Sequence, residues 1–167
     1  MQSKEELESF YEQSDPWSYQ TTADDVWRKN FYVTALAANP NPPYSTLFGR
    51  ALDVGAGEGF ITTDLPAIVT HGMEISDVAA SRFPPNVKRV MEPEGKYDLV
   101  ISTGTLYTQY NHEFIYNTIM KAACKTIAIG GIKDWLTYDY DFGKLVREFE
   151  FPYRSFTSCL RIYEVSG

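Results

Sequence analysis

Hydrophobic and polar residues alternate along the chain in short blocks, some spaced as in an amphipathic helix and others continuous as in a buried strand. Apolar residues at helical spacing follow Ser3 and Asp24, so these blocks predict two N-terminal helices. The apolar run at 97–102 predicts a strand buried on both faces. The expected helices cover 3–14, 24–38, a short stretch after Gly59, a short stretch from Asp77, 111–124 and 140–149, and the expected strands cover 50–54, 67–74, 87–91, 97–102 and 125–129.

The order of these blocks predicts the fold class. Strands that alternate with helices form a mostly parallel sheet through right-handed crossovers, with helices on both faces. Two aromatic and β-branched runs, at 153–158 and 160–165, predict an antiparallel hairpin at the C-terminal end of the sheet. We therefore expect an α/β fold, a three-layer Rossmann-like sandwich. The whole chain is expected to form one domain, with 1–44 as a helical lid and 45–167 as the sheet core.

The most specific motif is the glycine-rich turn in ALDVGAGEGF, residues 51–60. Asp53 ends the first predicted strand, and the alternating glycines let the backbone bend sharply and approach a ligand closely. A dinucleotide-binding turn requires glycine where this chain has Phe60, and its acid belongs on the next strand. An acid at the position of Asp53 instead suits a ligand with an ammonium group near the turn, as in S-adenosylmethionine (SAM). The motif disfavours NAD and favours SAM, with an ordinary strand-to-helix turn as the alternative.

A second acid, Glu74, ends the second predicted strand. Its carboxylate can accept both hydroxyl protons of a ribose, unless it is a solvated loop acid. Because ligands of such sheets lie beyond the carboxyl ends of the strands, Asp53, Glu74, Met91 and Ser102 are expected along one rim. Ile75 offers an apolar face for a purine ring, and the backbone near Met91 is placed to meet the edge of that ring.

Composition and charge exclude several other classes. A formal net charge of -7 argues against a broad nucleic-acid-binding face. Cys124 and Cys159 form no CxxC pair and have only two histidines to assist them, so neither a zinc site nor a disulfide framework is expected. Both thiols are expected in the core. No apolar run is long enough to cross a membrane, and the polar N-terminus favours a cytoplasmic protein. The sequence indicates no oligomeric state.

With these residues in this order, the chain resembles the class I SAM-dependent methyltransferases over about residues 45–165. The resemblance implies a SAM cofactor. The family's cofactor-binding residues correspond to Asp53, Gly55, Gly57 and Glu74, and Ala56 lies within the same turn.

The N-terminal run FYEQSDPWSY, residues 10–19, followed by Arg28, is similar to the nodulation-factor N-methyltransferases. These small enzymes alkylate an amine on a sugar or another small molecule. The similarity implies that Trp17 covers the cofactor, that Arg28 pairs with its methionine carboxylate, and that the acceptor is a small-molecule amine. Two departures stand out: Trp27-Arg28 stands where that branch has an Arg/Lys pair, and Gly104 replaces the acid usual at the end of the fourth strand. The short connection between Val90 and Tyr97 also indicates a missing crossover helix.

The catalytic requirement is mainly geometric, because in-line methyl transfer needs the nucleophile, methyl carbon and sulfur to be collinear. An amine acceptor must also lose a proton to expose its lone pair. Tyr107, Tyr110 and His112 follow the fourth strand and are the candidate bases, although the sequence alone assigns none of them this role. The segment 133–135 (KDW) follows the fifth strand and is a candidate contact for the acceptor, or an exposed loop.

Two other interpretations are considered. A binding module with the same fold but no catalytic activity is the main alternative, and a nucleotide-binding oxidoreductase is disfavoured by Phe60 and Asp53. The segment 41–44 (NPPY) matches a motif with which enzymes that methylate the amino groups of adenine, cytosine or glutamine hold their target. Because it precedes the first strand rather than following the fourth, we interpret it as a loop.

Overall fold

The computed structural model describes residues 1–39 and 45–166; the NPPY segment at 41–44 lies outside the described residues. The strands are β1 (Phe48–Val54), β2 (Ala67–Met73), β3 (Val87–Arg89), β4 (Tyr97–Thr103), β5 (Ala123–Ile132), β6 (Lys144–Tyr153) and β7 (Phe156–Glu164). The helices are α1 (Lys4–Tyr11), α2 (Ala23–Ala37), α3 (Asp77–Ser81) and α4 (His112–Ala122), together with the 3-10 helices η1 (Thr62–Asp64) and η2 (Lys133–Trp135).

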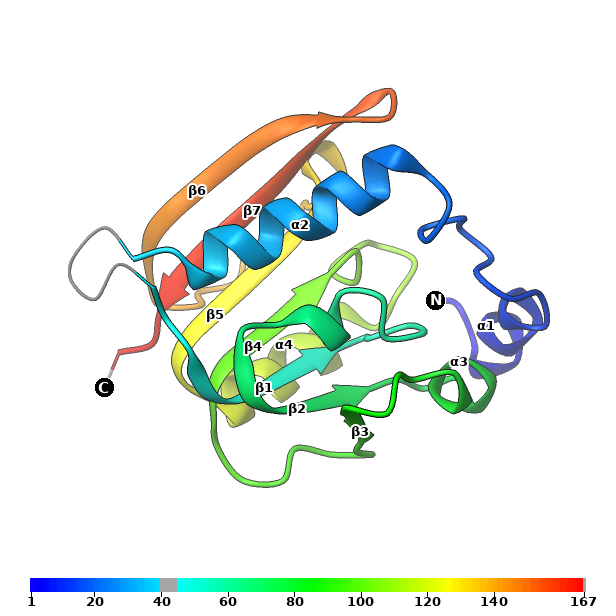
Figure 1. Cartoon of the computed structure of the whole chain (residues 1–167), viewed down its shortest axis with the longest axis horizontal. Coiled ribbons are helices and arrows are strands. Elements are labelled where there is room, and N and C mark those ends of the chain that lie inside the picture. Colours follow the sequence, from blue (N-terminus) through cyan, green and yellow to red (C-terminus); the bar gives the residue numbers. More distant parts are fainter. Residues whose placement is uncertain (40–44, 167) are drawn as a thin grey trace.

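All seven strands belong to one sheet in the order β3-β2-β1-β4-β5-β7-β6 (Figure 1). The first five strands are parallel, and β7 pairs antiparallel with both β5 and β6. The strand order reverses beside β1, where β2 and β4 lie on opposite sides of it. In an open sheet of this kind, the crevice at that reversal is the expected ligand site.

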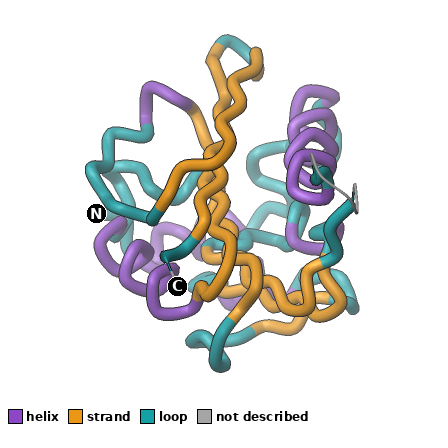
Figure 2. The backbone as a smooth tube through the Cα atoms, turned by 90° about the vertical axis from the view of Figure 1, so that its left-hand side faces the viewer, coloured by secondary structure: helices purple, strands orange, loops and turns teal. Residues whose placement is uncertain are grey.

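Two hydrophobic clusters cover the two faces of the sheet. Leu52 and Val100 pack with Ile119 of α4 on one face, while their neighbours Ala51 and Leu99 join the α2 side on the other. This alternation follows from the two-residue period of a strand, and apolar side chains on both faces explain the continuous apolar runs. Figure 2 shows the strands edge-on with helices on either side. The Rossmann-like α/β architecture with a C-terminal antiparallel hairpin is therefore confirmed.

The connection from β3 to β4 contains no helix, as the short spacing predicted. The other expected elements are present with shifted bounds, with two exceptions: the stretch after Gly59 forms only the single turn η1, and no helix forms at 140–149. Ser3 caps α1 with a full capping box, and Asn111 caps α4 through its side chain. Both caps were read correctly from the sequence because an oxygen-bearing side chain can accept the free N–H groups of the first turn.

The expected helix at 140–149 is wrong. Most of this stretch belongs to β6, where the alternation Glu148-Phe149-Glu150-Phe151 turns the phenylalanines toward α2 and the glutamates outward. The hairpin strands expected at 153–158 and 160–165 are also displaced, because the chain reverses at Arg154 and Ser155 rather than near residue 159. Arg154 has a φ of 52°, a left-handed backbone conformation that permits this tight turn.

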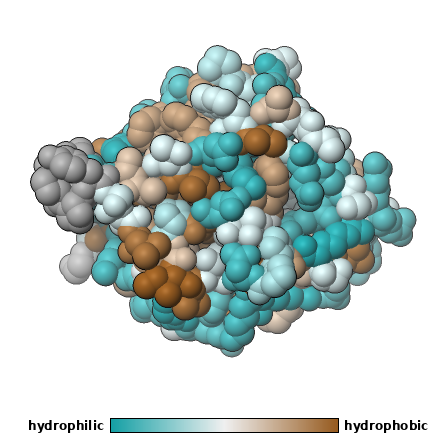
Figure 3. All heavy atoms as spheres, in the orientation of Figure 1, coloured by the Kyte–Doolittle hydropathy of each residue, from teal (hydrophilic) through white to brown (hydrophobic). Residues whose placement is uncertain are grey.

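The expectation that both cysteines are buried is half wrong, since Cys159 is buried whereas Cys124 is exposed and donates to the carbonyl of Tyr97. Among the described residues, none of the helices has the length and apolar character needed to span a bilayer. On the face shown in Figure 3, hydrophobic atoms gather mainly near the start of β1 and β2. Leu47 and Ile68 are exposed in that region. This patch lies at the end of the sheet opposite the carboxyl rim.

Tyr32 joins α2 to the sheet, and its loss gives a test of the fold. Its fully buried hydroxyl contacts Ser158 Oγ at 3.1 Å and donates to the carbonyl of Cys159 at 3.0 Å. We expect Tyr32→Phe to lower the free energy of unfolding by about 1–3 kcal/mol, because buried acceptors lose their donor. Urea denaturation measures the change. Trp27→Phe on the exposed side of α2 is the control, and equal stability of the two variants would contradict the assignment.

Candidate functional site

A cavity of about 570 Å³ lies at the carboxyl ends of the parallel strands. This volume falls within the range of small-molecule sites. Its floor is formed by the ends of β1, β2 and β4. In Figure 1, β1 and β2 point toward the N-terminal segment, which covers the cavity. Of the residues expected to bind a cofactor, the cavity is lined by Trp17, Arg28, Asp53, Gly55, Ala56, Gly57, Glu74, Ile75 and Met91.

The glycine turn takes the conformation that its sequence predicted. Gly55 and Gly57 have φ values of 82° and 60°, which residues with a Cβ rarely adopt. A Cβ on Gly55 would also collide with the side chain of Thr105. The backbone N–H groups of Gly55 and Ala56 both donate to the carbonyl of Met73 at 2.9 Å. The turn is therefore held against the end of β2, with its backbone exposed to the cavity.

Asp53 is a buried acid with incomplete hydrogen bonding. Its Oδ2 accepts a hydrogen bond from Thr62 Oγ1 at 2.7 Å, whereas its Oδ1 has no partner within the described chain. Burial raises the pKa of Asp53 to about 7, and the nearby charge of Glu74 adds to this shift. An unpaired buried carboxylate oxygen costs free energy, so a cationic donor entering the cavity would satisfy it.

Glu74 stands beside the same turn. Its Oε2 accepts from the backbone N–H of Gly57 at 2.7 Å, and its Oε1 accepts from that of Ser76 at 3.1 Å. Burial raises the pKa of Glu74, while these two N–H donors act in the opposite direction. Each carboxylate oxygen has a further acceptor position. Glu74 is thus oriented by the backbone and retains the capacity to accept two more hydrogen bonds.

Two apolar side chains flank this acid. Ile75 follows Glu74 directly, and Met91 lies just beyond β3; both line the cavity and are 51% and 69% exposed. Large apolar groups left this exposed on a concave surface favour a flat apolar ligand group that covers them.

The N-terminal lid is fastened through α1 to the segment that follows Glu74 and Ile75. Glu8 accepts hydrogen bonds from the backbone N–H groups of Asp77 at 2.5 Å and Val78 at 3.2 Å, and from Ser76 Oγ at 2.9 Å. Trp17 follows this helix and packs against Tyr11 and Tyr19, with ring centroids 5.2 and 6.0 Å apart. The lid therefore closes over the cavity with aromatic side chains facing inward.

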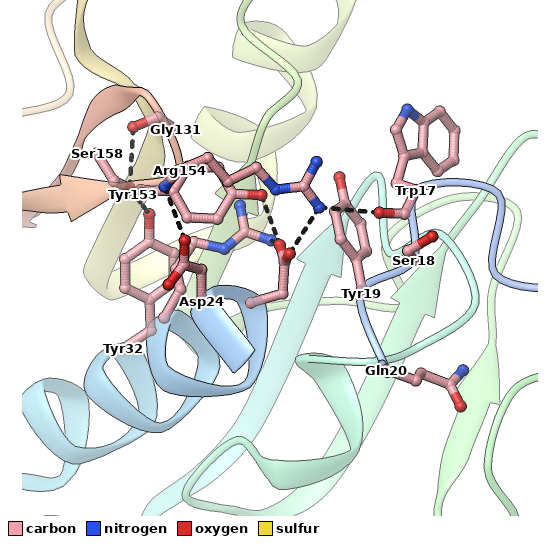
Figure 4. Close-up of polar contacts among 12 residues, drawn as sticks. Trp17, Ser18, Tyr19, Gln20, Asp24, Tyr32, Gly131, Tyr153, Arg154 and Ser158 are labelled. Carbon is pink, nitrogen blue, oxygen red and sulfur yellow. Dashed lines mark hydrogen bonds and ion pairs between the residues drawn. The ribbon is translucent and has the colours of Figure 1, made fainter. Parts of the chain in front are cut away.

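A buried ionic cluster fastens the other end of the lid (Figure 4). Asp25 is fully buried and accepts from Tyr153 Oη at 2.5 Å and from Arg154 Nη2 at 2.7 Å. Arg154 Nη2 also donates to the carbonyl of Trp17 at 2.9 Å, so the β6–β7 turn is bonded directly to the lid.

Arg28 belongs to the same cluster. Its Nη2 lies 3.3 Å from Asp25 Oδ1, and its guanidinium lies over the rings of Tyr19 and Tyr153. The pKa of Arg28 is raised by its tyrosine and aspartate neighbours although burial lowers it, so it remains charged. Its buried Nε has no partner among the described residues. Arg28 therefore presents an unused donor beside the cavity it lines.

Two of the expected site residues are not brought into the cavity. Ser102 is fully buried, donates to the carbonyl of Val54 at 2.6 Å and contacts Thr105 Oγ1. Its role is to join β4 to β1 beneath the rim. His112 is exposed at the start of α4, where its Nδ1 contacts Tyr140 Oη at 2.7 Å. Neither residue lines the cavity.

Tyr107 and Tyr110 do line the cavity. The Tyr107 hydroxyl accepts a hydrogen bond from the backbone N–H of Ile132 at 2.8 Å. Burial raises its pKa far above the ordinary range, so it keeps its proton at neutral pH. Burial also raises the pKa of Tyr110. Both phenols are consequently poor bases.

Sequence reasoning missed the contribution of the C-terminal hairpin. Tyr153, Arg154 and Phe156 line the cavity, although only their strand character was expected. The alternation of glutamate and phenylalanine before Pro152 was the signal that would have placed the turn. Of the segment 133–135, only Trp135 reaches this cavity, while Lys133 pairs with Glu150 at 2.7 Å. The described residues contain no cluster able to hold a metal ion.

The fold is shared with many solved structures. The chain is similar to Thermoplasma acidophilum protein 1320 over 100% of both chains, with a TM-score of 0.62 and 16% identity. It is similar to the CurJ carbon methyltransferase over 99% of this chain and 62% of that one, with a TM-score of 0.65 and 10% identity. The plantazolicin methyltransferase BpumL, determined with a monoazolic desmethylPZN analog and SAH, matches 77% of this chain and 58% of its own, with a TM-score of 0.53 and 15% identity.

No family model and no curated protein matches the sequence. At these identities the structural similarity shows the fold alone, and that fold is the Rossmann-like fold of methyltransferases. The resemblance to class I methyltransferases thus holds at the level of structure. None of the similarities points to the nodulation-factor N-methyltransferases.

The unpaired state of Asp53 predicts an unusual pH dependence of stability. Because its pKa is about 7 in the fold and near 3.8 in the unfolded chain, the folded state holds an extra proton between these values. This group therefore makes stability fall as pH rises from about 4 to about 7. We expect Asp53→Asn to be more stable than the wild type at pH 8, by about 1–3 kcal/mol. The two proteins should be similar at pH 4.

Urea denaturation across pH 4–8 measures this difference. Asp64→Asn, which removes a half-exposed acid of η1, is the matched control. A less stable Asp53→Asn variant at pH 8 would show that Asp53 is ionised and well stabilised in the free protein.

Proposed function

We propose that this protein is a SAM-dependent methyltransferase that transfers a methyl group to the nitrogen of a small-molecule amine. The observation that carries the proposal is the unpaired Oδ1 of Asp53, buried beside a glycine turn whose neighbour Glu74 keeps free acceptor capacity. Two acids in this arrangement suit a ligand with an ammonium group at one point and a vicinal diol at another. The fold of the chain, shared with methyltransferases, supports the same ligand.

The residues present fit this cofactor. Asp53 Oδ1 would accept from the amino group, and Arg28, with its unpaired Nε, would pair with the carboxylate. Glu74 would accept from the ribose hydroxyls. The exposed side chains of Ile75 and Met91 would cover the purine ring. The amino group, the carboxylate and the ribose hydroxyls of the ligand would therefore each meet a complementary group that the protein leaves available.

When bound, SAM supplies a methyl group on a positively charged sulfur, already activated for displacement. The protein's task is to hold the reacting atoms in line and to exclude water. The lid performs the second task, because Glu8 fastens it at one side of the cavity and Arg154 fastens it at the other. Its aromatic residue Trp17 lines the enclosed space.

Several features support a small acceptor. The cavity is roofed by the lid and has the volume of a small-molecule site. The net charge of -7 favours a neutral or cationic acceptor over nucleic acid.

The two unpaired thiols, Cys124 and Cys159, fit a reducing compartment such as the cytoplasm.

Calorimetry with SAM and NAD tests the cofactor assignment. SAM at 100 times its dissociation constant should stabilise the fold by about 2.7 kcal/mol, and NAD should give no shift. Asp53→Asn and Glu74→Gln should each weaken SAM binding about 10- to 100-fold at pH 8, because each removes a hydrogen bond to a charged group.

Two substitutions of the same chemistry serve as controls. Asp64→Asn and Glu94→Gln alter acids outside the cavity, each paired with a lysine, and should leave SAM affinity unchanged. Absence of any SAM-induced shift in the wild type would reject the proposed cofactor. If SAM binds but no amine is methylated, the protein is a binding module with this fold.

A further inference from the structure

Three aromatic side chains, Tyr107, Trp135 and Phe156, form one side of the cavity; we call them the aromatic wall. They come from three separate segments: the loop after β4, the turn η2, and the first residue of β7. The Trp135 ring lies edge-on to both others, with centroids 5.4 Å from Tyr107 and 5.2 Å from Phe156. Residues distant in sequence thus converge on a single apolar surface, on the part of the rim that the cofactor-binding acids do not occupy.

This surface is incompletely covered by the protein. Trp135 is 44% exposed and Phe156 is 41% exposed, although both face a concave site. A ligand that covers such rings removes apolar area from water, and a flat ring adds favourable stacked or edge-to-face contacts. The shape and character of the wall therefore favour a planar, apolar acceptor over a saturated or polyhydroxylated one.

The wall also lacks a group that could remove a proton. Tyr107 remains protonated, as argued above, and the guanidinium of the neighbouring Arg154 has no acceptor capacity. Asp134 lines a smaller hollow beyond Trp135, and His112 lies outside the cavity. The other carboxylates that line the cavity are engaged elsewhere: Asp15 accepts from two backbone N–H groups, Glu58 pairs with Arg82, and Asp53 and Glu74 are assigned to the cofactor. No free carboxylate, imidazole, thiol or amine among the described residues is therefore assigned to the wall as a base.

An apolar aromatic wall without a base limits which class of amine can be the acceptor. An alkyl amine has a pKa near that of lysine, about 10.4, so at neutral pH it is protonated and needs a base. An amine attached to an aromatic ring is neutral at this pH, because its lone pair is delocalised into the ring. Resting on the proposed function, we infer that the acceptor is a planar aromatic amine.

The transfer step is balanced without a protein base. The neutral nitrogen uses its lone pair to form the new N–C bond, the C–S bond breaks, and its electron pair stays on sulfur. The product nitrogen is then positively charged and acidic, so it releases its proton to water. The aromatic wall contributes to this step only by orienting the acceptor so that its nitrogen lies in line with the C–S bond.

A matched set of three ligands tests the inference: 1-naphthylamine, its saturated counterpart decahydro-1-naphthylamine, and 1-naphthol. With SAH-saturated protein at pH 7, calorimetry should show 1-naphthylamine binding at least about 10-fold more tightly than the saturated amine. With SAM, only 1-naphthylamine should yield a methylated product, identified by mass spectrometry as the N-methyl compound.

Variants of the wall test the site itself. Trp135→Ala and Phe156→Ala should each raise the dissociation constant of 1-naphthylamine about 3- to 10-fold, because each removes an aromatic contact. Their affinity for SAH should not change. Trp27→Ala is the control, since this exposed indole lies on α2 and does not line the cavity.

The results separate the two proposals. If SAM does not bind, the proposed function fails. If SAM binds but the saturated amine is the preferred substrate, or 1-naphthylamine is not methylated, only the aromatic-amine inference is overturned. If 1-naphthol is the preferred substrate, transfer to nitrogen is overturned as well, while the SAM assignment stands. Unchanged binding of 1-naphthylamine in both wall variants would also overturn it.

Discussion

The site depends on the bonding between the glycine turn and the end of β2. In the parallel register of β1 and β2, Asp53 stands opposite Gly72 and Val54 opposite Met73. The turn then bends back so that two of its N–H groups reach the Met73 carbonyl and a third reaches Glu74. This geometry requires positive φ angles that only glycine adopts readily. Without it, Asp53 and Glu74 would occupy neighbouring strands but would not face one cavity.

The two most deeply buried acids, Asp25 and Asp53, differ in how far the protein compensates their charge. Asp25 is surrounded by Arg28, Arg154 and the hydroxyl of Tyr153, so its burial is compensated within the protein. Asp53 has only the hydroxyl of Thr62, and one of its oxygens remains without a partner. A buried polar group of this kind is rare unless something outside the chain completes it. The contrast indicates that Asp25 is structural, and it supports the proposal that Asp53 binds a ligand.

The sequence predicted the sheet well because its strands are buried on both faces. A short continuous apolar run such as β4 is typical of a strand buried on both faces. An acid at the end of a parallel strand lies at the carboxyl edge of the sheet, where ligands of such folds bind. The side-chain direction of Ser102 was harder to predict. Ser102 lies one residue before the end of β4, and strand alternation directs its hydroxyl to the carbonyl of Val54 rather than into the cavity. Position at the rim therefore did not establish contact with the ligand.

The hairpin was misplaced for a different reason. The apolar residues of 140–149 fit the period of a helix as well as that of a strand, and only the alternation that includes Phe149 and Phe151 favours a strand. The pairing of this segment with β7 in the structure shows that it is a strand. Since Arg154 and Phe156 reach the cavity from this turn, an error of a few residues in the turn concealed them. The sequence named Trp135 only as one of three candidates at 133–135, because its contacts with Tyr107 and Phe156 depend on tertiary packing.

The lid connects the two halves of the cavity mechanically. At one end, Glu8 accepts from the backbone N–H groups of Asp77 and Val78, close to Glu74 and Ile75, which under the proposed function would hold a ribose and a purine. At the other end, Arg154 links the carbonyl of Trp17 to Asp25 and thus to the strand turn that also carries Phe156. Opening the lid must break the hydrogen bonds of Glu8 at one end, those of Arg154 at the other, or both. Under the proposed function, the first attachment would lie next to the residues that touch the cofactor and the second next to Phe156 of the aromatic wall, so that one lid would span both parts of the site.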